Sequence, residues 1–159
     1  MLAGLRQLPV NVLVTLGHQI HPAELGAQPA NVHIERYLAQ ADVLPHCDLV
    51  VFHGGSGTLT GALAHGLPMV LLPMGADQPA NAHRCDALGL GVNLEAISAT
   101  PADVRDAAAS VLADPAYRQA AQRLQAEIAA LHEPAKAVGL LERLAIERQP
   151  VLDPSRELD

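Results

Sequence analysis

A short string of glycine and hydroxyl residues, His53-Gly54-Gly55-Ser56-Gly57-Thr58, carries the clearest chemical signal in the sequence. It follows the apolar run 48–52 and precedes a helix-like stretch, 59–66, that ends in glycine. A strand, a glycine turn and a helix in this order aim several backbone N–H groups and the positive end of a helix dipole at one point in space. The sequence therefore predicts an anion site, in particular a phosphate site, at this turn.

Each residue type in this glycine string suits an anion. The glycines lack Cβ atoms, so a ligand approaches the backbone closely. Ser56 and Thr58 donate hydroxyl hydrogen bonds to phosphate oxygens, or cap the following helix. His53 stands at the carboxyl end of the expected strand, where open α/β sheets place their ligands. An ordinary turn, with Ser56 as the helix cap and His53 as a loop residue, explains the same string.

Length and composition indicate one domain. The chain has 159 residues, half of them apolar, but one Phe, two Tyr and no Trp, so we expect a core of Leu, Val and Ala. The net charge of −7 and the lack of a basic block argue against a nucleic-acid partner. No apolar run has the length of a membrane span, and we expect a cytoplasmic protein in which Cys47 and Cys85 are buried and reduced. His18 and His21 do not make a metal pair, and no metal or other cofactor is expected.

Strands and helices alternate along the chain. Apolar runs predict strands at 10–16, 32–37, 48–52, 69–72 and 91–94. Helical patterns cover 1–8, 41–46, 59–66, 78–88, 103–113, 116–131 and 134–148. Strands that stay apolar without alternation are typical of parallel sheets covered on both faces. The order of elements predicts an α/β fold with a doubly wound parallel sheet in residues 1–149, followed by a flexible tail, 150–159.

A series of short motifs resembles the donor-binding half of the GT-B glycosyltransferases that act on bacterial natural products and macrolides, relatives of the UDP-glucuronosyl and plant secondary-metabolite enzymes. The matching residues stand in family order, at 37–40, 43–45, 53–58, 64–68, 72–73, 77–78, 81–82 and 88–92. The resemblance covers nearly the whole chain. It implies a Rossmann-like half of a GT-B fold, which binds a UDP- or dTDP-sugar for transfer to a small hydroxylated acceptor.

The resemblance also implies roles for single residues. The six residues of the glycine string match the contacts to the donor diphosphate. Asp77 and Gln78 match the pair that hydrogen-bonds the sugar hydroxyls, which suits a carboxylate and an amide. Tyr37 stands where relatives stack a Trp on the base, and the backbone of Leu38 stands where relatives bind the base edge. Asp77 is alternatively a plain helix cap, and Tyr37 a core aromatic at a strand end.

The sequence departs from the family pattern in three places. Ala39 replaces a proline, so the base loop is expected to be less rigid. Gly61 stands where plant relatives carry a ribose-binding glutamate, which favours a deoxyribose donor such as a dTDP-sugar. The acceptor-binding half of the family's enzymes, which carries their catalytic base, has no counterpart in this sequence. No catalytic residue is assigned, and we expect no transfer by the chain alone; an acceptor-binding domain is its implied partner, in cis or in trans.

The donor half itself is expected to lack its first strand, because residues 1–9 match the end of the helix that follows that strand in relatives. An alternative register assigns Thr15-Leu16-Gly17 to the loop after that strand. In a sheet of order 3-2-1-4-5-6 the first strand is central, so its absence leaves 10–16 and 48–52 with unpaired backbone groups. We expect these two strands to pair directly, to borrow a strand from another chain or to stay loose, and the chain to self-associate.

Other functions fit the same residues. The chain is alternatively the donor subunit of a two-chain glycosyltransferase, or a non-enzymatic nucleotide-binding remnant. A sugar-nucleotide epimerase shares the GT-B architecture, but the adjacent Asp77 and Gln78 favour a transferase.

Overall fold

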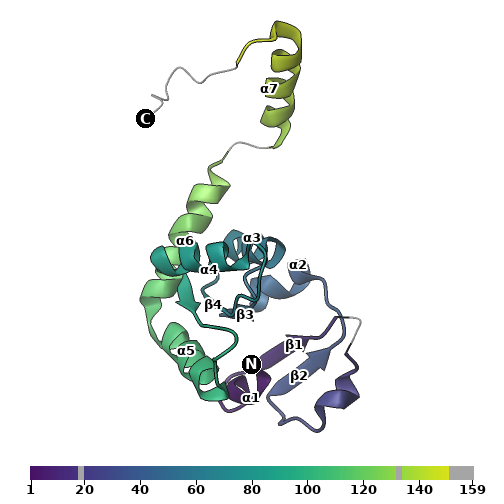
Figure 1. The fold of residues 1–159 in the computed structure, drawn as a ribbon, viewed down its shortest axis with the longest axis vertical. Coiled ribbons are helices and arrows are strands. Elements are labelled where there is room, and N and C mark those ends of the chain that lie inside the picture. Colours follow the sequence, from purple (N-terminus) through teal and green to yellow (C-terminus); the bar gives the residue numbers. More distant parts are fainter. Residues whose placement is uncertain (18–19, 132–133, 151–159) are drawn as a thin grey trace. The chain divides into compact units, whose positions relative to one another are not determined.

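All the strands of the computed structural model pair in parallel, in two sheets (Figure 1). The structure describes residues 1–17, 20–131 and 134–150. One sheet pairs β1 (Val12–Thr15) with β2 (Val32–Glu35), and the other has the order β3 (Val50–Phe52), β4 (Met69–Leu71), β5 (Gly91–Asn93). Each strand lies inside a predicted one, so the expected parallel α/β arrangement is confirmed.

Helices connect the strands. Their bounds are α1 (Leu2–Leu5), η1 (Pro22–Leu25), α2 (Gln40–Val43), η2 (Leu44–His46), α3 (Ser56–Ala64), α4 (Gln78–Ala87), α5 (Pro101–Ala113), α6 (Pro115–Ala129) and α7 (Pro134–Glu147), where η1 and η2 are 3-10 turns. Proline begins several of them, because its fixed φ and missing N–H suit the first helical position. Across the described ranges, no helix combines the length and the apolar character that a membrane crossing requires.

A reciprocal cap explains why α5 begins two residues before the predicted start. The Thr100 Oγ1 accepts a hydrogen bond from the Asp103 N–H at 3.2 Å, and the Asp103 carboxylate accepts one from the Thr100 N–H at 2.8 Å. These bonds satisfy backbone donors that the first helical turn leaves free. The Thr100 N–H and the Thr100 hydroxyl, which donates to the same carboxylate at 2.7 Å, both lower the pKa of the Asp103 carboxyl.

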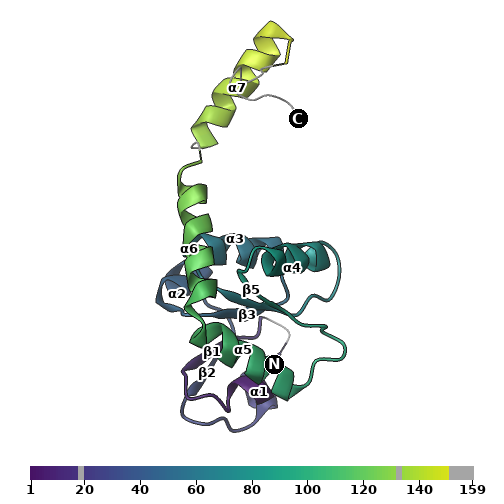
Figure 2. The ribbon, with the colours of Figure 1, turned by 90° about the vertical axis from the view of Figure 1, so that its left-hand side faces the viewer.

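The central strand β4 is buried on both faces. Met69 and Leu71 pack in one apolar cluster with residues of α3, α4 and α6, while Val70 packs in a second cluster with Val104 and Ala108 of α5. Figure 2 shows the same layers, with α3 and α4 on one side of β3 and β5 and α5 on the other. The expected two-sided burial is confirmed, and it explains why β4 is apolar at every position.

Two free cysteines contribute to this interior. Cys85 is buried, as predicted, while Cys47 is half-buried. Burial raises the pKa of both thiols, and the neighbouring Asp48 adds to the effect at Cys47. Both side chains are therefore less reactive than exposed thiols.

The chain divides into two compact units, Met1–Ile128 and Ala129–Asp159. The first contains both sheets and α1 to α5. The described part of the second consists mainly of α7, which exposes Val138, Leu141 and Ile146. The predicted tail, 150–159, lies outside the described residues from position 151 onward, and the predicted domain end at residue 149 stays a prediction.

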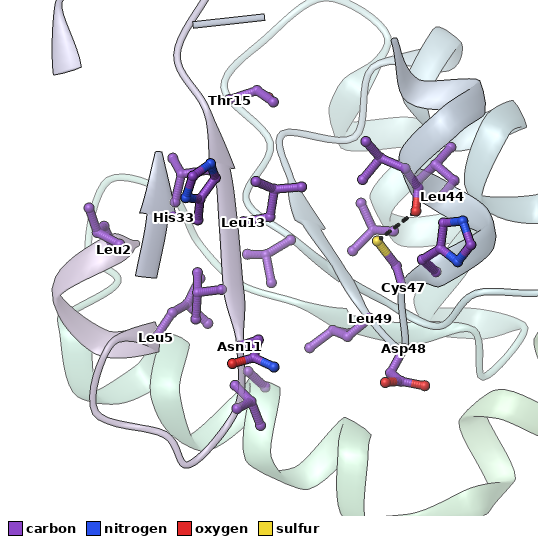
Figure 3. Close-up of a pocket in the computed structure, with 18 of the residues that line it drawn as sticks. Leu2, Leu5, Asn11, Leu13, Thr15, His33, Leu44, Cys47, Asp48 and Leu49 are labelled. Atoms are coloured by element: carbon purple, nitrogen blue, oxygen red, sulfur yellow. Dashed lines mark hydrogen bonds between the residues drawn. The ribbon is translucent and has the colours of Figure 1, made fainter. Parts of the chain in front are cut away.

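An apolar cavity of about 920 Å³ separates the two sheets, lined on opposite sides by β1 and β3 (Figure 3). Within the described ranges β1 pairs with β2 and β3 pairs with β4, but β1 and β3 do not pair with each other. Direct pairing of these two strands, one of the three expected arrangements, is therefore not the one that the structure adopts.

Candidate functional site

The glycine string forms the turn that joins β3 to α3. Gly54 has a φ of +86° and is buried, so the chain reverses where a Cβ atom would be strained and would lie 3.3 Å from the Gln78 carbonyl oxygen. Gly55 is extended and occupies the N-cap position, and no side chain caps the helix there. The first N–H groups of α3 therefore point into open space at its positive end, as an anion site requires.

His53 lies beside this helix start. Its ring is exposed and contacts the Phe52 ring edge-on, with centroids 6.1 Å apart. A Cβ atom on Gly55 would lie only 2.5 Å from the His53 Nε2, so the imidazole covers the backbone of the turn. The turn thus presents an imidazole nitrogen and free backbone N–H groups to the same space.

The hydroxyl of Ser56 is committed within the protein. It donates a short hydrogen bond of 2.5 Å to the Asp77 carboxylate. Asp77 lies at the start of α4, but its side chain does not cap that helix, so the interpretation of Asp77 as a plain N-cap is wrong. Hydrogen bonds from Ser56 and Asn81 hold the pKa of the Asp77 carboxyl below its ordinary value. The expected phosphate contact at Ser56 and sugar contact at Asp77 are therefore linked by one hydrogen bond.

Asn81 completes this cluster, and no role was predicted for it from the sequence. Its Nδ2 donates to the Gly54 carbonyl at 2.9 Å and to the Asp77 carboxylate at 3.1 Å, and it lies 3.3 Å from the Ser56 Oγ. Asn81 thereby ties α4 to the turn. Its spacing of four residues from Asp77 places both side chains on one face of the helix, and this spacing is the signal in the sequence from which the contact could have been predicted.

Replacing Asn81 with alanine is expected to loosen the turn, because the buried Gly54 carbonyl loses its side-chain donor. An unpaired buried carbonyl costs about 1–3 kcal/mol, so the free energy of unfolding should fall by about that amount. Urea unfolding measures it, with Asn93→Ala at the exposed end of β5 as the matched control. If the two variants unfold at the same urea concentration, Asn81 does not hold the turn.

Gln78 orders the loop that follows β4. Its Oε1 accepts hydrogen bonds from the Met74 N–H at 2.8 Å and the Gly75 N–H at 3.3 Å. The next residue, Ala76, has a φ of +54°, a conformation that non-glycine residues adopt rarely. The predicted sugar-binding amide therefore has its oxygen engaged by the loop.

The remaining predicted residues lie around the same edge of the sheets. Thr58 Oγ1 accepts a hydrogen bond of 2.8 Å from the Gln40 Nε2, which links α2 to α3. Tyr37 and Leu38 lie on the segment between β2 and α2, where Tyr37 is 70 % exposed and Leu38 is half-buried. The exposure of Tyr37 argues against the interpretation as a core aromatic. His18 lies outside the described residues, and within them no group of three potential metal-ligating side chains is present.

Comparison with protein families and with curated proteins gives one consistent result. The profile of the family described as "Erythromycin biosynthesis protein CIII-like, C-terminal domain" matches residues 1–144. Demethyllactenocin mycarosyltransferase from Streptomyces fradiae is 37% identical over 139 residues, which are 87% of this chain and 30% of that protein. TDP-daunosamine transferase DnrS from Streptomyces peucetius is 36% identical over 146 residues, 91% of this chain and 34% of that protein. The chain thus spans about a third of the length of these relatives.

Solved structures with the same fold agree with the relatives found by sequence. Glycosyltransferase VinC in complex with dTDP superimposes with a TM-score of 0.86 at 31% identity, over 94% of this chain and 38% of that one. Spinosyn rhamnosyltransferase SpnG complexed with thymidine diphosphate gives a TM-score of 0.81 at 34% identity, over 88% of this chain and 38% of that one. The expected Rossmann-like half of a GT-B fold is confirmed. The chain therefore belongs to the family of erythromycin biosynthesis protein CIII-like C-terminal domains, which are parts of natural-product glycosyltransferases.

Proposed function

We propose that residues 1–149 form the donor-binding domain of a glycosyltransferase that takes its sugar from a nucleoside diphosphate. The observation that carries this proposal is the uncapped start of α3 behind the glycine turn, with the His53 ring beside it. The dTDP named with two similar structures supports a thymidine nucleotide as the ligand. The base would stack on Tyr37 and meet the backbone of Leu38, and the sugar would lie toward Asp77 and Gln78.

The chemical task of this site is to stabilise the leaving diphosphate. As the bond between the anomeric carbon and the phosphate oxygen breaks, negative charge develops on the diphosphate. Backbone N–H groups and the helix dipole act on that charge without reorganisation, and His53 and Thr58 add polar contacts. Ser56 joins them only when its hydrogen bond to Asp77 opens, which frees the carboxylate to accept from a sugar hydroxyl. Donor binding would then couple the diphosphate contact at Ser56 to the sugar contact at Asp77.

The acceptor and the base that deprotonates it belong to polypeptide beyond these residues. The chain spans about a third of the length of its relatives, and the resemblance to the GT-B enzymes places their catalytic base in the acceptor-binding half. We therefore propose that the chain alone binds donor but transfers no sugar. The polypeptide that completes it, in cis or as a separate subunit, would supply the acceptor site.

The roles of Asp77 and Gln78 are tested by comparing dTDP-glucose with dTDP. Asp77→Asn still accepts from Ser56 but lacks the charge, so it should bind dTDP-glucose about 5- to 10-fold more weakly and dTDP no more weakly, given about 1 kcal/mol for a hydrogen bond. Gln78→Ala should likewise weaken binding of the sugar nucleotide alone. Isothermal titration calorimetry gives both affinities. Equal losses for the two ligands would mean that these residues act through the fold rather than through the sugar.

A further inference from the structure

The Asp77 carboxylate is held through one of its two oxygens. The Ser56 hydroxyl and the Asn81 side-chain amide both donate to Oδ2, at 2.5 Å and 3.1 Å. In the part of the chain that the structure describes, no other residue donates a hydrogen bond to this carboxylate. The exposed Oδ1 is therefore free to accept from a ligand, and a sugar hydroxyl is a suitable donor.

The two donors differ in how they respond to a diphosphate. Ser56 has one hydroxyl hydrogen and lies in the glycine turn, so a phosphate oxygen competes with Asp77 for it. Asn81 has two hydrogens on its Nδ2, which lies 2.9 Å from the Gly54 carbonyl oxygen as well as near the Asp77 carboxylate. Both of these partners are acceptors only, which fixes the orientation of the amide. When Ser56 turns to the diphosphate, Asn81 is the side-chain donor that stays on Asp77.

The amide of Asn81 also ties the carboxylate to a rigid point of the turn. Gly54 is buried with a φ of +86°, and its carbonyl is part of the backbone that leads into α3. Asn81 thus bridges the turn that would bind the diphosphate and the carboxylate that would bind the sugar. Without this bridge, the exposed Asp77 side chain would rotate freely once Ser56 leaves it, and the sugar would have to restore its order at a cost in entropy.

We propose that Asn81 is a positioning residue for the donor sugar, because it keeps the Asp77 Oδ1 turned toward the sugar after the Ser56 hydroxyl has turned to the diphosphate. This role rests on the proposed function and deepens it. The preference of the site for a sugar nucleotide over the bare nucleotide then depends on a residue that acts through Asp77.

A double-mutant cycle with Asp77 tests this role. Isothermal titration calorimetry of the unmodified chain, Asn81→Ala, Asp77→Ala and the double variant gives the ratio of the affinities for dTDP-glucose and dTDP. Asn81→Ala should lower this ratio about 3- to 10-fold, as expected for the loss of one hydrogen bond. It should have no effect on the ratio once Asp77 is alanine, because the two residues act as one unit. Asn93→Ala, at the exposed end of β5, is the control and should leave the ratio unchanged.

The affinity ratio separates positioning from stability. A turn that Asn81→Ala merely loosens would weaken the binding of both ligands equally and leave the ratio as it is. An unchanged ratio, or a loss of the same size in the Asp77→Ala background, would overturn the role of Asn81 while the sugar contact at Asp77 still stands. If Asp77→Ala itself leaves the ratio unchanged, the proposed sugar contact fails, and the role of Asn81 fails with it.

Solvent exchange of the Asn81 side-chain amide, measured by NMR, tests the same role without a variant. In the complex of the unmodified chain with dTDP-glucose, both Nδ2 hydrogens should exchange with water at least about tenfold more slowly than those of the exposed Asn93. One of them is bonded to the Gly54 carbonyl and the other to the Asp77 carboxylate. Slow exchange of only one hydrogen, or of neither, would mean that Asn81 does not hold Asp77 in the complex, and would overturn the proposal.

Discussion

Replacing His53 with alanine is expected to weaken dTDP binding about 10- to 150-fold and to leave the fold intact. The ring is exposed and covers the turn at the start of α3, so its loss removes a contact to the diphosphate but no part of the core. Hydrogen bonds to charged groups contribute about 1.5–3 kcal/mol, which corresponds to this range. Isothermal titration calorimetry measures the affinity, and thermal unfolding by circular dichroism checks the fold.

Two further variants make the His53 result specific. His33→Ala removes an exposed imidazole from β2 and should leave dTDP binding unchanged. Gly55→Ala should weaken dTDP binding with His53 still present, because the new Cβ atom lies 2.5 Å from the Nε2 and displaces the ring. If His53→Ala unfolds the chain, or binds dTDP as tightly as the unmodified chain, the histidine is not a ligand of the diphosphate.

Replacing Gly91 with alanine is expected to destabilise the fold by about 3 kcal/mol or more. A Cβ atom at this position would lie 1.8 Å from the Met69 carbonyl oxygen, and Gly91 is paired with Met69 in the ladder of β4 and β5. Overpacking in a core usually costs about 1–3 kcal/mol, and the cost here lies at the upper end because the obstructing atoms are backbone. Urea unfolding measures the loss.

Gly139→Ala is the matched control, since a Cβ atom at Gly139 in α7 meets nothing within 4 Å. Alanine in a helix is more favourable than glycine by about 0.5–1 kcal/mol, so this variant should be neutral or slightly stabilised. Similar unfolding curves for the two variants would mean that β5 does not approach β4 as closely as the structure places it.

Local signals in the sequence were sufficient for most of the fold. The strands are short apolar runs between turn residues, and their lack of alternation follows from cover on both faces. The glycine turn was predictable as well, because Gly54 and Gly55 stand between an apolar strand and a helix. The bounds were less accurate, since β1 is limited to Val12–Thr15 by the length of its partner β2, which is a long-range contact.

The hydrogen-bond partners of the candidate site could not be predicted, because they depend on how elements far apart in the sequence pack together. The Asp77 carboxylate meets the hydroxyl of Ser56 and the amide of Asn81 rather than the N–H groups of its own helix. That choice depends on how close α3 and α4 lie, which is set by the packing of Ala62 and Ala82 against β4. The roles of Gln40, which links α2 to α3, and of Gln78, which orders the loop after β4, have the same origin. Residue types were sufficient to predict the turn that forms the candidate site, and packing determined which side chains contact each other there.

The central claim is that the turn from His53 to Thr58 binds a diphosphate. Isothermal titration calorimetry of the unmodified chain with dTDP, dTMP and thymidine tests it most directly. The account predicts that affinity falls in that order, with dTDP bound at least about tenfold more tightly than thymidine, a difference of 1.4 kcal/mol or more. Equal affinities for dTDP and thymidine would contradict it, because the phosphates would then make no net contribution at the start of α3.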